Sequence, residues 1–130
     1  MIFKVFELNK VDLPKFNFFL LYGKNIGLQN EIIEKYFTNK FDGTISRYEE
    51  NEFIVEFDTI YSEILNKSLF ESKKIILISR ATDKIVKFVS QIFEKEIKDV
   101  KIIIRSGILE KKSKLRKLFE KDKKIVTIPF

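Results

Sequence analysis

Short apolar runs alternate along the chain with segments in which apolar residues recur every three or four positions. Continuous apolar runs of this length are typical of strands buried on both faces of a parallel sheet, whereas the wider spacing is typical of amphipathic helices. The runs predict five strands, over residues 16–22, 44–48, 74–79, 100–106 and 124–129. The second of these is the weakest prediction.

Each gap between these runs has the apolar spacing of one helix, with a face that can cover the sheet. The inward residues predicted for the four helices are Leu28, Ile32, Ile33, Tyr36 and Phe37; Phe53, Phe57, Ile60, Tyr61, Ile64 and Leu65; Ile85, Phe88, Val89, Ile92 and Phe93; and Leu115, Leu118 and Phe119. Asn51 is the predicted N-cap of the second helix, which we expect to bend or split near Asp58. Thr82 or Asp83 is expected to cap the third, and the fourth is expected over 110–121.

Strands and helices that alternate in this way predict a three-layer α/β/α sandwich around a five-stranded parallel sheet, because right-handed crossovers place helices on both faces. A chain of 130 residues has room for one such domain, so we expect residues 1–130 to form a single unit. The last predicted strand runs almost to Phe130, which suggests the N-terminal piece of a longer protein.

The turn after the first strand, "LLYGKNIGLQNEII", has features of a phosphate-binding loop. A working P-loop needs Gly, four residues, Gly, Lys and then Ser or Thr. Here only three residues separate Gly23 from Gly27, Leu28 and Gln29 follow, and Lys24 lies at the front of the loop. Gly23, Lys24, Asn25 and Gly27 therefore form a degenerate P-loop, or else a plain strand-to-helix turn whose two glycines adopt unusual backbone angles.

Catalytic residues of the common kinds are scarce. The chain has no cysteine and no histidine, which excludes thiol nucleophiles, disulfides, the usual zinc ligands and the commonest general base. The third strand ends in "ISRATD", where a nucleotide hydrolase would carry acidic residues for magnesium. Asp83 reads better as a helix cap than as a metal ligand, and Ser106 better as a turn residue than as a polar sensor. We expect no catalysis, metal or cofactor.

The net charge of +6 is concentrated near the C-terminal end. The stretch from Lys111 to Lys124 holds eight basic and two acidic residues, so the rest of the chain is balanced. Its predicted helix is either a solvated outer face or a surface that contacts DNA phosphates, with Lys111, Lys112, Lys114 and Lys117 as candidate contacts. The apolar runs are too short to span a membrane and the N-terminus lacks signal-peptide features, so we expect a cytoplasmic protein without a membrane partner.

The segment "NKSLFESKK" before the third strand contains a second candidate site. Ser68 and Glu71 have the spacing of a capping box, which predicts a short helical turn. Leu69 and Phe70 are adjacent in that turn and point about 100° apart, so one turn cannot easily bury both. They form either an exposed hydrophobic plug for a partner's pocket or a cover for the edge of the core.

Three stretches, in their order and spacing, resemble the N-terminal domain of the delta subunit of bacterial DNA polymerase III: "LLYGKNIGLQNEII", "KSLFESKKIILISRATDK" and "SGILEKKSKLRKLFEKDKKIVTIPF". The resemblance covers nearly the whole chain. It implies a P-loop NTPase fold of the AAA+ type that neither binds nor hydrolyses ATP. It also implies a chain without catalysis of its own. The assembly to which such a chain belongs carries out DNA-directed DNA polymerisation, a nucleotidyltransferase reaction.

The resemblance also implies a partner and a site. Delta subunits bind the beta sliding clamp and open it, so that the clamp loader can place it on primed DNA during replication. Their plug is a Ser-Leu-Phe motif, which here corresponds to Ser68, Leu69 and Phe70. The family's lid and C-terminal collar domains, the latter joining delta to the other clamp-loader subunits, have no counterpart in these residues.

Two other functions remain open from the sequence. One is a nucleotide-binding domain with an unorthodox loop, which predicts magnesium-dependent ATP binding that weakens when Lys24 is changed. The other is a basic nucleic-acid-binding module that acts through residues Lys111 to Lys124 and binds DNA with a steep salt dependence in the absence of a clamp.

Overall fold

The computed structural model describes residues 1–66 and 73–130. Within these residues, five parallel strands form one sheet in the order β2-β3-β4-β1-β5. The strands are β1 (Phe18–Tyr22), β2 (Gly43–Glu49), β3 (Lys73–Ser79), β4 (Val100–Ser106) and β5 (Ile125–Pro129). All five predicted strands are confirmed, although β1 begins two residues later than the pattern indicated.

Helices connect the strands in the predicted alternation. They are α1 (Ile26–Ile33), which continues as a π-helix (Glu34–Thr38), α2 (Glu50–Val55), α3 (Phe57–Leu65), α4 (Val86–Phe93) after a 3₁₀ turn (Asp83–Ile85), and α5 (Lys114–Lys121). The chain starts with two further 3₁₀ helices, Val5–Lys10 and Leu13–Lys15.

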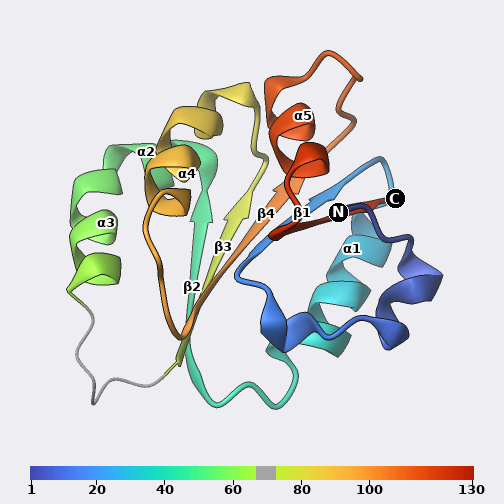
Figure 1. The fold of residues 1–130 in the computed structure, drawn as a ribbon, viewed down its shortest axis with the longest axis horizontal. Coiled ribbons are helices and arrows are strands. Elements are labelled where there is room, and N and C mark those ends of the chain that lie inside the picture. The colour runs from blue at the N-terminus through green and yellow to red at the C-terminus, as the bar shows by residue number, and fades with distance from the viewer. Residues whose placement is uncertain (67–72) are drawn as a thin grey trace.

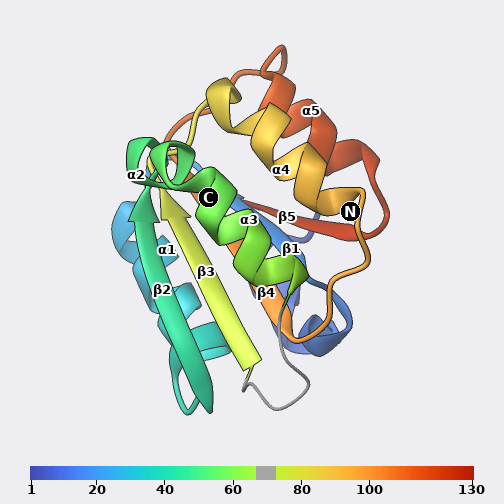
Figure 2. The same ribbon diagram turned by 90° about the vertical axis from the view of Figure 1, so that its left-hand side faces the viewer.

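The elements form three layers (Figures 1 and 2). Helices α2 to α5 cover one face of the sheet, and α1 covers the other together with the N-terminal segment. Successive residues of β1 alternate between the layers: Phe18, Leu20 and Tyr22 pack toward α2–α5, while Phe19 and Leu21 pack toward α1. Because both faces are covered, every residue of β1 is buried, which explains its uninterrupted apolar run.

The N-terminal segment forms part of the sheet's cover, which the sequence pattern did not predict. The amide of Thr127 donates to the carbonyl of Met1 at 2.7 Å, and the amide of Phe3 donates to the carbonyl of Thr127 at 2.9 Å. Leu8 and Leu13 are buried on the α1 side of the sheet. Apolar residues are frequent in this segment but too irregularly spaced to show a helical period.

The predicted second helix is divided, and its start is set by a different residue from the one expected. Asn51 is not the N-cap: Glu49 holds that position, and its backbone amide donates to the Glu52 carboxylate at 2.9 Å in a capping box. The break comes at Glu56, between α2 and α3, two positions before Asp58. Leu65, expected to point inward, is 45% exposed because it is the last residue of α3.

The fourth predicted helix is shorter than expected. Ser113 is its N-cap, with a hydroxyl that accepts from the amide of Arg116 at 3.2 Å, so α5 starts at Lys114 and not at residue 110. Leu115 and Phe119 are fully buried as predicted, and Leu118 packs against the core while half-buried. Lys111 and Lys112 therefore precede the helix.

Candidate functional site

The predicted degenerate P-loop corresponds to the turn between β1 and α1, at the C-terminal edge of the sheet. Gly23 has a φ of 136°, and its amide donates to the carbonyl of Gly107 at 2.9 Å. A Cβ atom at Gly23 would overlap the carbonyl of Phe130, so the residue needs glycine for both its conformation and its packing. Gly27 differs from the prediction: it lies within α1, and glycine is not required there by its backbone angles.

The four predicted loop residues all lie in this turn or at the start of α1. Of these, Gly23 and Asn25 have structural roles. The side chain of Asn25 caps α1 by accepting from the amide of Leu28 at 3.0 Å. Lys24 is exposed at the front of the loop.

The interior of the loop is filled by Gln29, a residue outside the four predicted loop positions. Its side chain is fully buried. The carboxamide nitrogen donates to the carbonyls of Ser106 at 3.1 Å and Gly23 at 3.4 Å. Gln29 stands six positions after Gly23, which is the spacing of the lysine from the first glycine in a P-loop. Counting from Gly23 and not from Gly27 is the signal that would have found it.

Arg105 closes this arrangement from β4. Its Nε donates to the carboxamide oxygen of Gln29 at 3.3 Å, and its Nη2 donates to the carbonyl of Ile26 at 3.4 Å. Burial lowers the pKa of the Arg105 guanidinium, an effect that the negative charge of Glu49 opposes. The side chains of Gln29 and Arg105 thus hydrogen-bond to each other and to nearby backbone carbonyls.

The end of β3 is organised by a second polar group. The carboxylate of Glu50, a buried side chain at the start of α2, accepts from the amide of Thr82 at 2.6 Å and from its hydroxyl at 2.9 Å. Ser106 is not a turn residue: it is the last residue of β4, it is buried, and its hydroxyl donates to the carbonyl of Ala81 at 2.9 Å. These contacts join the ends of β3 and β4 directly.

Asp83 is a helix cap, but for α5 and not for the helix that follows it. Its Oδ1 accepts from the amide of Leu115 at 3.0 Å and from the hydroxyl of Ser113 at 2.7 Å. The amide of Leu115, with the hydroxyl of Ser113 as the next cause, lowers the pKa of the Asp83 carboxyl. Thr82 caps the helical turn that leads to α4, as predicted. Among the described residues, no three acidic side chains are grouped so that they could hold a metal ion.

The basic stretch Lys111 to Lys124 is not one patch in space. Helix α5 begins beside the end of β3, where Asp83 caps it, and leads to the start of β5. Lys112 and Lys114 consequently line a cavity at the C-terminal edge of the sheet, whereas Lys123 and Lys124 line another at the N-terminal edge. Lys111, Lys112, Lys114 and Lys117 are all exposed, and Lys112 forms an ion pair with Glu110 at 3.4 Å.

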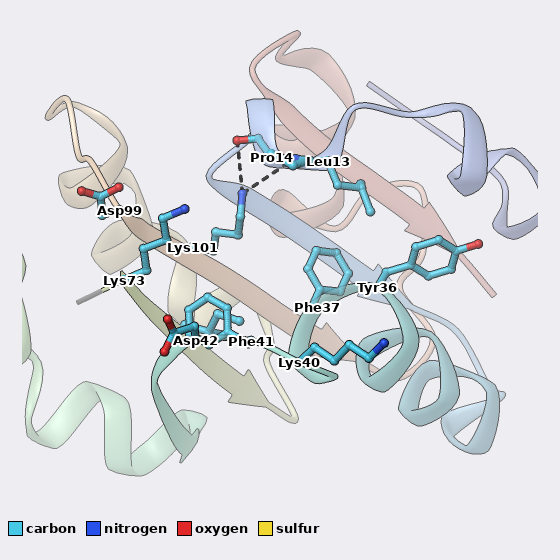
Figure 3. A pocket seen from close by; sticks show the side chains of 11 residues that line it. Leu13, Pro14, Tyr36, Phe37, Lys40, Phe41, Asp42, Lys73, Asp99 and Lys101 are labelled. Atoms are coloured by element: carbon cyan, nitrogen blue, oxygen red, sulfur yellow. Dashed lines mark hydrogen bonds between the residues drawn. The ribbon is translucent and has the colours of Figure 1, made fainter.

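Lys101 lies beside a cavity of about 550 Å³ at the N-terminal edge (Figure 3). Its ammonium donates to the carbonyls of Phe16 at 2.6 Å, Leu13 at 3.3 Å and Pro14 at 3.4 Å. Burial, with a smaller effect from Lys73, lowers the pKa of Lys101. All three donors of the ammonium are used on backbone groups, so Lys101 ties the N-terminal segment to β4 and has no free N–H donor for a ligand.

The predicted plug, Ser68, Leu69 and Phe70, lies outside the described residues. Its flanks are described. Helix α3 ends at Leu65 and β3 begins at Lys73, at the edge of the sheet opposite the β1–α1 loop. The ammonium of Lys74 and the carboxylate of Glu63 form an ion pair at 3.7 Å between these two elements.

The fold and the loop define an α/β protein with a parallel five-stranded sheet, three layers and a glycine turn after β1, an interior strand of the sheet. No model of a protein family matches the chain, and no curated protein matches it. In the part of the chain that the structure describes, none of the helices has the length and apolar character needed to cross a membrane.

Proposed function

We propose that this chain is the AAA+-like N-terminal domain of a clamp-loader delta subunit, which binds and opens the beta sliding clamp without hydrolysing ATP. The observation that carries the proposal is Gln29. A P-loop-like turn follows β1, and a neutral, buried side chain hydrogen-bonded to Ser106 and Gly23 stands at the spacing of the phosphate-binding lysine. This combination suits a protein that keeps the frame of a nucleotide-binding domain without its chemistry.

The frame itself supports the proposal. Parallel sheets of this kind bind ligands beyond the C-terminal ends of the strands, and the glycine turn lies there. Polar residues at that edge hydrogen-bond to one another: Arg105 to Gln29, Glu50 to Thr82, and Asp83 to Ser113. A magnesium nucleotide would need to replace several of these bonds.

Clamp opening requires binding energy and no covalent step. Leu69 and Phe70 enter a hydrophobic pocket of the clamp, where each contributes on the order of 2 kcal/mol or more, as apolar anchors do at interface hot spots. The chain favours the open ring because it binds that form more tightly than the closed one. Sister subunits that bind ATP determine when the plug is presented.

The test is a titration of the beta sliding clamp from the same source with the wild-type chain and with the Leu69→Ala/Phe70→Ala variant. We expect binding by the wild type and loss of at least about thirtyfold in affinity for the variant, which corresponds to about 2 kcal/mol. Ile26→Ala/Ile108→Ala is the matched control, since it removes two exposed apolar side chains, 49% and 65% accessible, from the opposite edge of the sheet. Circular dichroism checks that each variant is folded.

The possible outcomes test the plug site and the clamp-binding function separately. Equal binding by the wild type and the plug variant places the clamp contact elsewhere. Absence of wild-type binding contradicts the proposed function. In that event, magnesium-dependent ATP binding that weakens in Lys24→Ala would favour the nucleotide-binding alternative.

We also propose that Lys111, Lys112, Lys114 and Lys117 contact the phosphates of primed DNA inside the loader. All four side chains are exposed. Replacing the four by alanine should weaken binding to a primed duplex and reduce the salt slope by about 0.9 for each phosphate that is no longer neutralised. The control variant replaces Lys95, Lys98, Lys123 and Lys124, which line the cavity at the other edge. An equal loss in both variants would assign the effect to net charge.

A further inference from the structure

A groove with an apolar floor and a basic rim opens between α2, α4 and the start of α5. Ile54, Val86 and Phe88 supply its apolar lining, and Lys84, Lys87 and Lys114 supply its cations. Its volume of about 510 Å³ is enough for one or two apolar side chains of a partner. We refer to these six residues as the α4 groove.

The charge of the rim lysines is not balanced by ion pairs among the described residues. The ion pairs there are formed by Lys74, Arg80, Lys112 and Arg116, and not by Lys84, Lys87 or Lys114. Asp83 also lines the groove and interacts electrostatically with Lys114, so the groove carries three positive charges against one negative charge. The groove is therefore a net positive surface over an apolar floor.

The same chain carries a segment of the opposite character beside this groove. From Glu49 to Leu65 the sequence has six acidic residues and no basic one. At the junction of α2 and α3, Val55 is 85% exposed, and Glu56 and Asp58 next to it are exposed as well. We refer to Val55, Glu56 and Asp58 as the acidic knob.

We propose that the α4 groove binds the acidic knob of a second copy of this chain, forming a two-fold symmetric dimer. The complementarity is in both chemistry and shape: an exposed valine with two carboxylates meets an apolar hollow with three lysines. Groove and knob lie side by side, since Ile54 lines the groove and Val55 begins the knob. A two-fold rotation about an axis near α2 can therefore place each knob in the other copy's groove, as an isologous interface requires.

Nucleic acid is a poorer occupant of the groove as a whole, although Lys114 on its rim is also one of the four proposed DNA contacts. Phosphates would use the three lysines but would leave Val55 and the apolar floor without a partner. The dimer is independent of the proposed clamp contact, because the elements that flank the plug, the end of α3 and the start of β3, lie at the opposite edge of the sheet. Failure of one proposal leaves the other intact.

Sedimentation equilibrium over a range of protein concentrations tests the dimer. We expect the wild type to self-associate, and Lys84→Glu/Lys87→Glu or Glu56→Lys/Asp58→Lys alone to weaken association at least about tenfold through like-charge repulsion. Mixing the two variants should restore association, because each knob then meets a groove of opposite charge. Lys95→Glu/Lys98→Glu, at the other edge, is the control with the same charge change and should associate as the wild type does.

Several results would overturn the proposal. The wild type could remain a monomer at every concentration, or each charge-reversal variant could associate as strongly as the wild type. A mixture of the two variants that stays monomeric would show that the groove and the knob do not meet. A competing primed duplex that dissociates the dimer through Lys84 and Lys87 would assign the groove to DNA.

Discussion

The carboxamide nitrogen of Gln29 lies 3.1 Å from the carbonyl oxygen of Ser106 and joins α1 to the end of β4. The same side chain reaches the Gly23 carbonyl at 3.4 Å and receives the Arg105 Nε at 3.3 Å. The buried side-chain amide of Gln29 thus links α1, which connects β1 to β2, with β4.

Gln29→Ala should destabilise the chain by about 1–3 kcal/mol, because the carbonyl of Ser106 and the guanidinium of Arg105 lose a buried partner. Urea unfolding followed by circular dichroism measures this change. Asn30→Ala, at the next and exposed position of the same helix, is the control and should change stability by less than about 0.5 kcal/mol. Equal effects of the two substitutions would show that the buried hydrogen bonds contribute little.

Gly23→Ala should be among the most damaging single substitutions in the loop. The residue has a φ of 136°, and the new Cβ would overlap the Phe130 carbonyl, so we expect a loss of more than about 2 kcal/mol. Thermal unfolding gives the comparison with Gly107→Ala, where a Cβ meets no atom within 4 Å. Gly27→Ala, inside α1, should raise stability by about 0.5–1 kcal/mol. A mild effect at Gly23 would contradict the close approach to Phe130.

Asp83 should make stability depend on pH in the acid range. Its folded-state pKa lies below the ordinary value of 3.8, because the amide of Leu115 and the hydroxyl of Ser113 stabilise the carboxylate. The stabilisation is fully present above the unfolded pKa and is lost as the pH falls through the folded pKa. The stability difference between the wild type and Asp83→Asn should therefore shrink below pH 3.8.

Urea unfolding at a series of pH values measures that difference. Glu31→Gln, an exposed change on α1 with the same loss of charge, is the control. A difference between the wild type and Asp83→Asn that stays constant down to about pH 2 would show that the cap of α5 does not depend on the charge of Asp83.

Lys101→Met should loosen the N-terminal segment. The substitution keeps most of the apolar stem but leaves the carbonyls of Leu13, Pro14 and Phe16 without their shared donor. We expect a loss of about 1–3 kcal/mol and faster hydrogen exchange in residues 1–16. Lys98→Met, an exposed change just before the same strand, is the control. Unchanged exchange in the N-terminal segment would refute this role of Lys101.

The architecture followed from the sequence because each buried strand is a continuous apolar run. Runs such as Lys74–Ser79 and Val100–Ser106 can hardly be anything else in a chain whose remaining segments have helical spacing. The strand order was not predictable in this way. Periodicity describes what each segment buries but not which segment lies beside it, so nothing in the apolar runs placed β1 between β4 and β5.

The site was harder to predict for a related reason. Lys24 is one of the four predicted loop residues, yet it is exposed, and the loop is organised by the neutral Gln29. Asn51 was a better capping residue by type than Glu49, but the carboxylate of Glu52 can reach back only to the amide of Glu49. The basic run from Lys111 appeared continuous because a sequence does not show that α5 separates its two ends.

The position of β1 in the sheet determines when the sheet can be completed. Phe18 pairs with Ile102 of β4 and with Ile125 of β5, so β1, the first of the described strands, has the last two as its neighbours. During synthesis, its five residues have no neighbouring strand until β4 and β5 have left the ribosome. Folding dominated by such distant pairings is slow, and the waiting strand is a point at which unfinished chains can associate with one another.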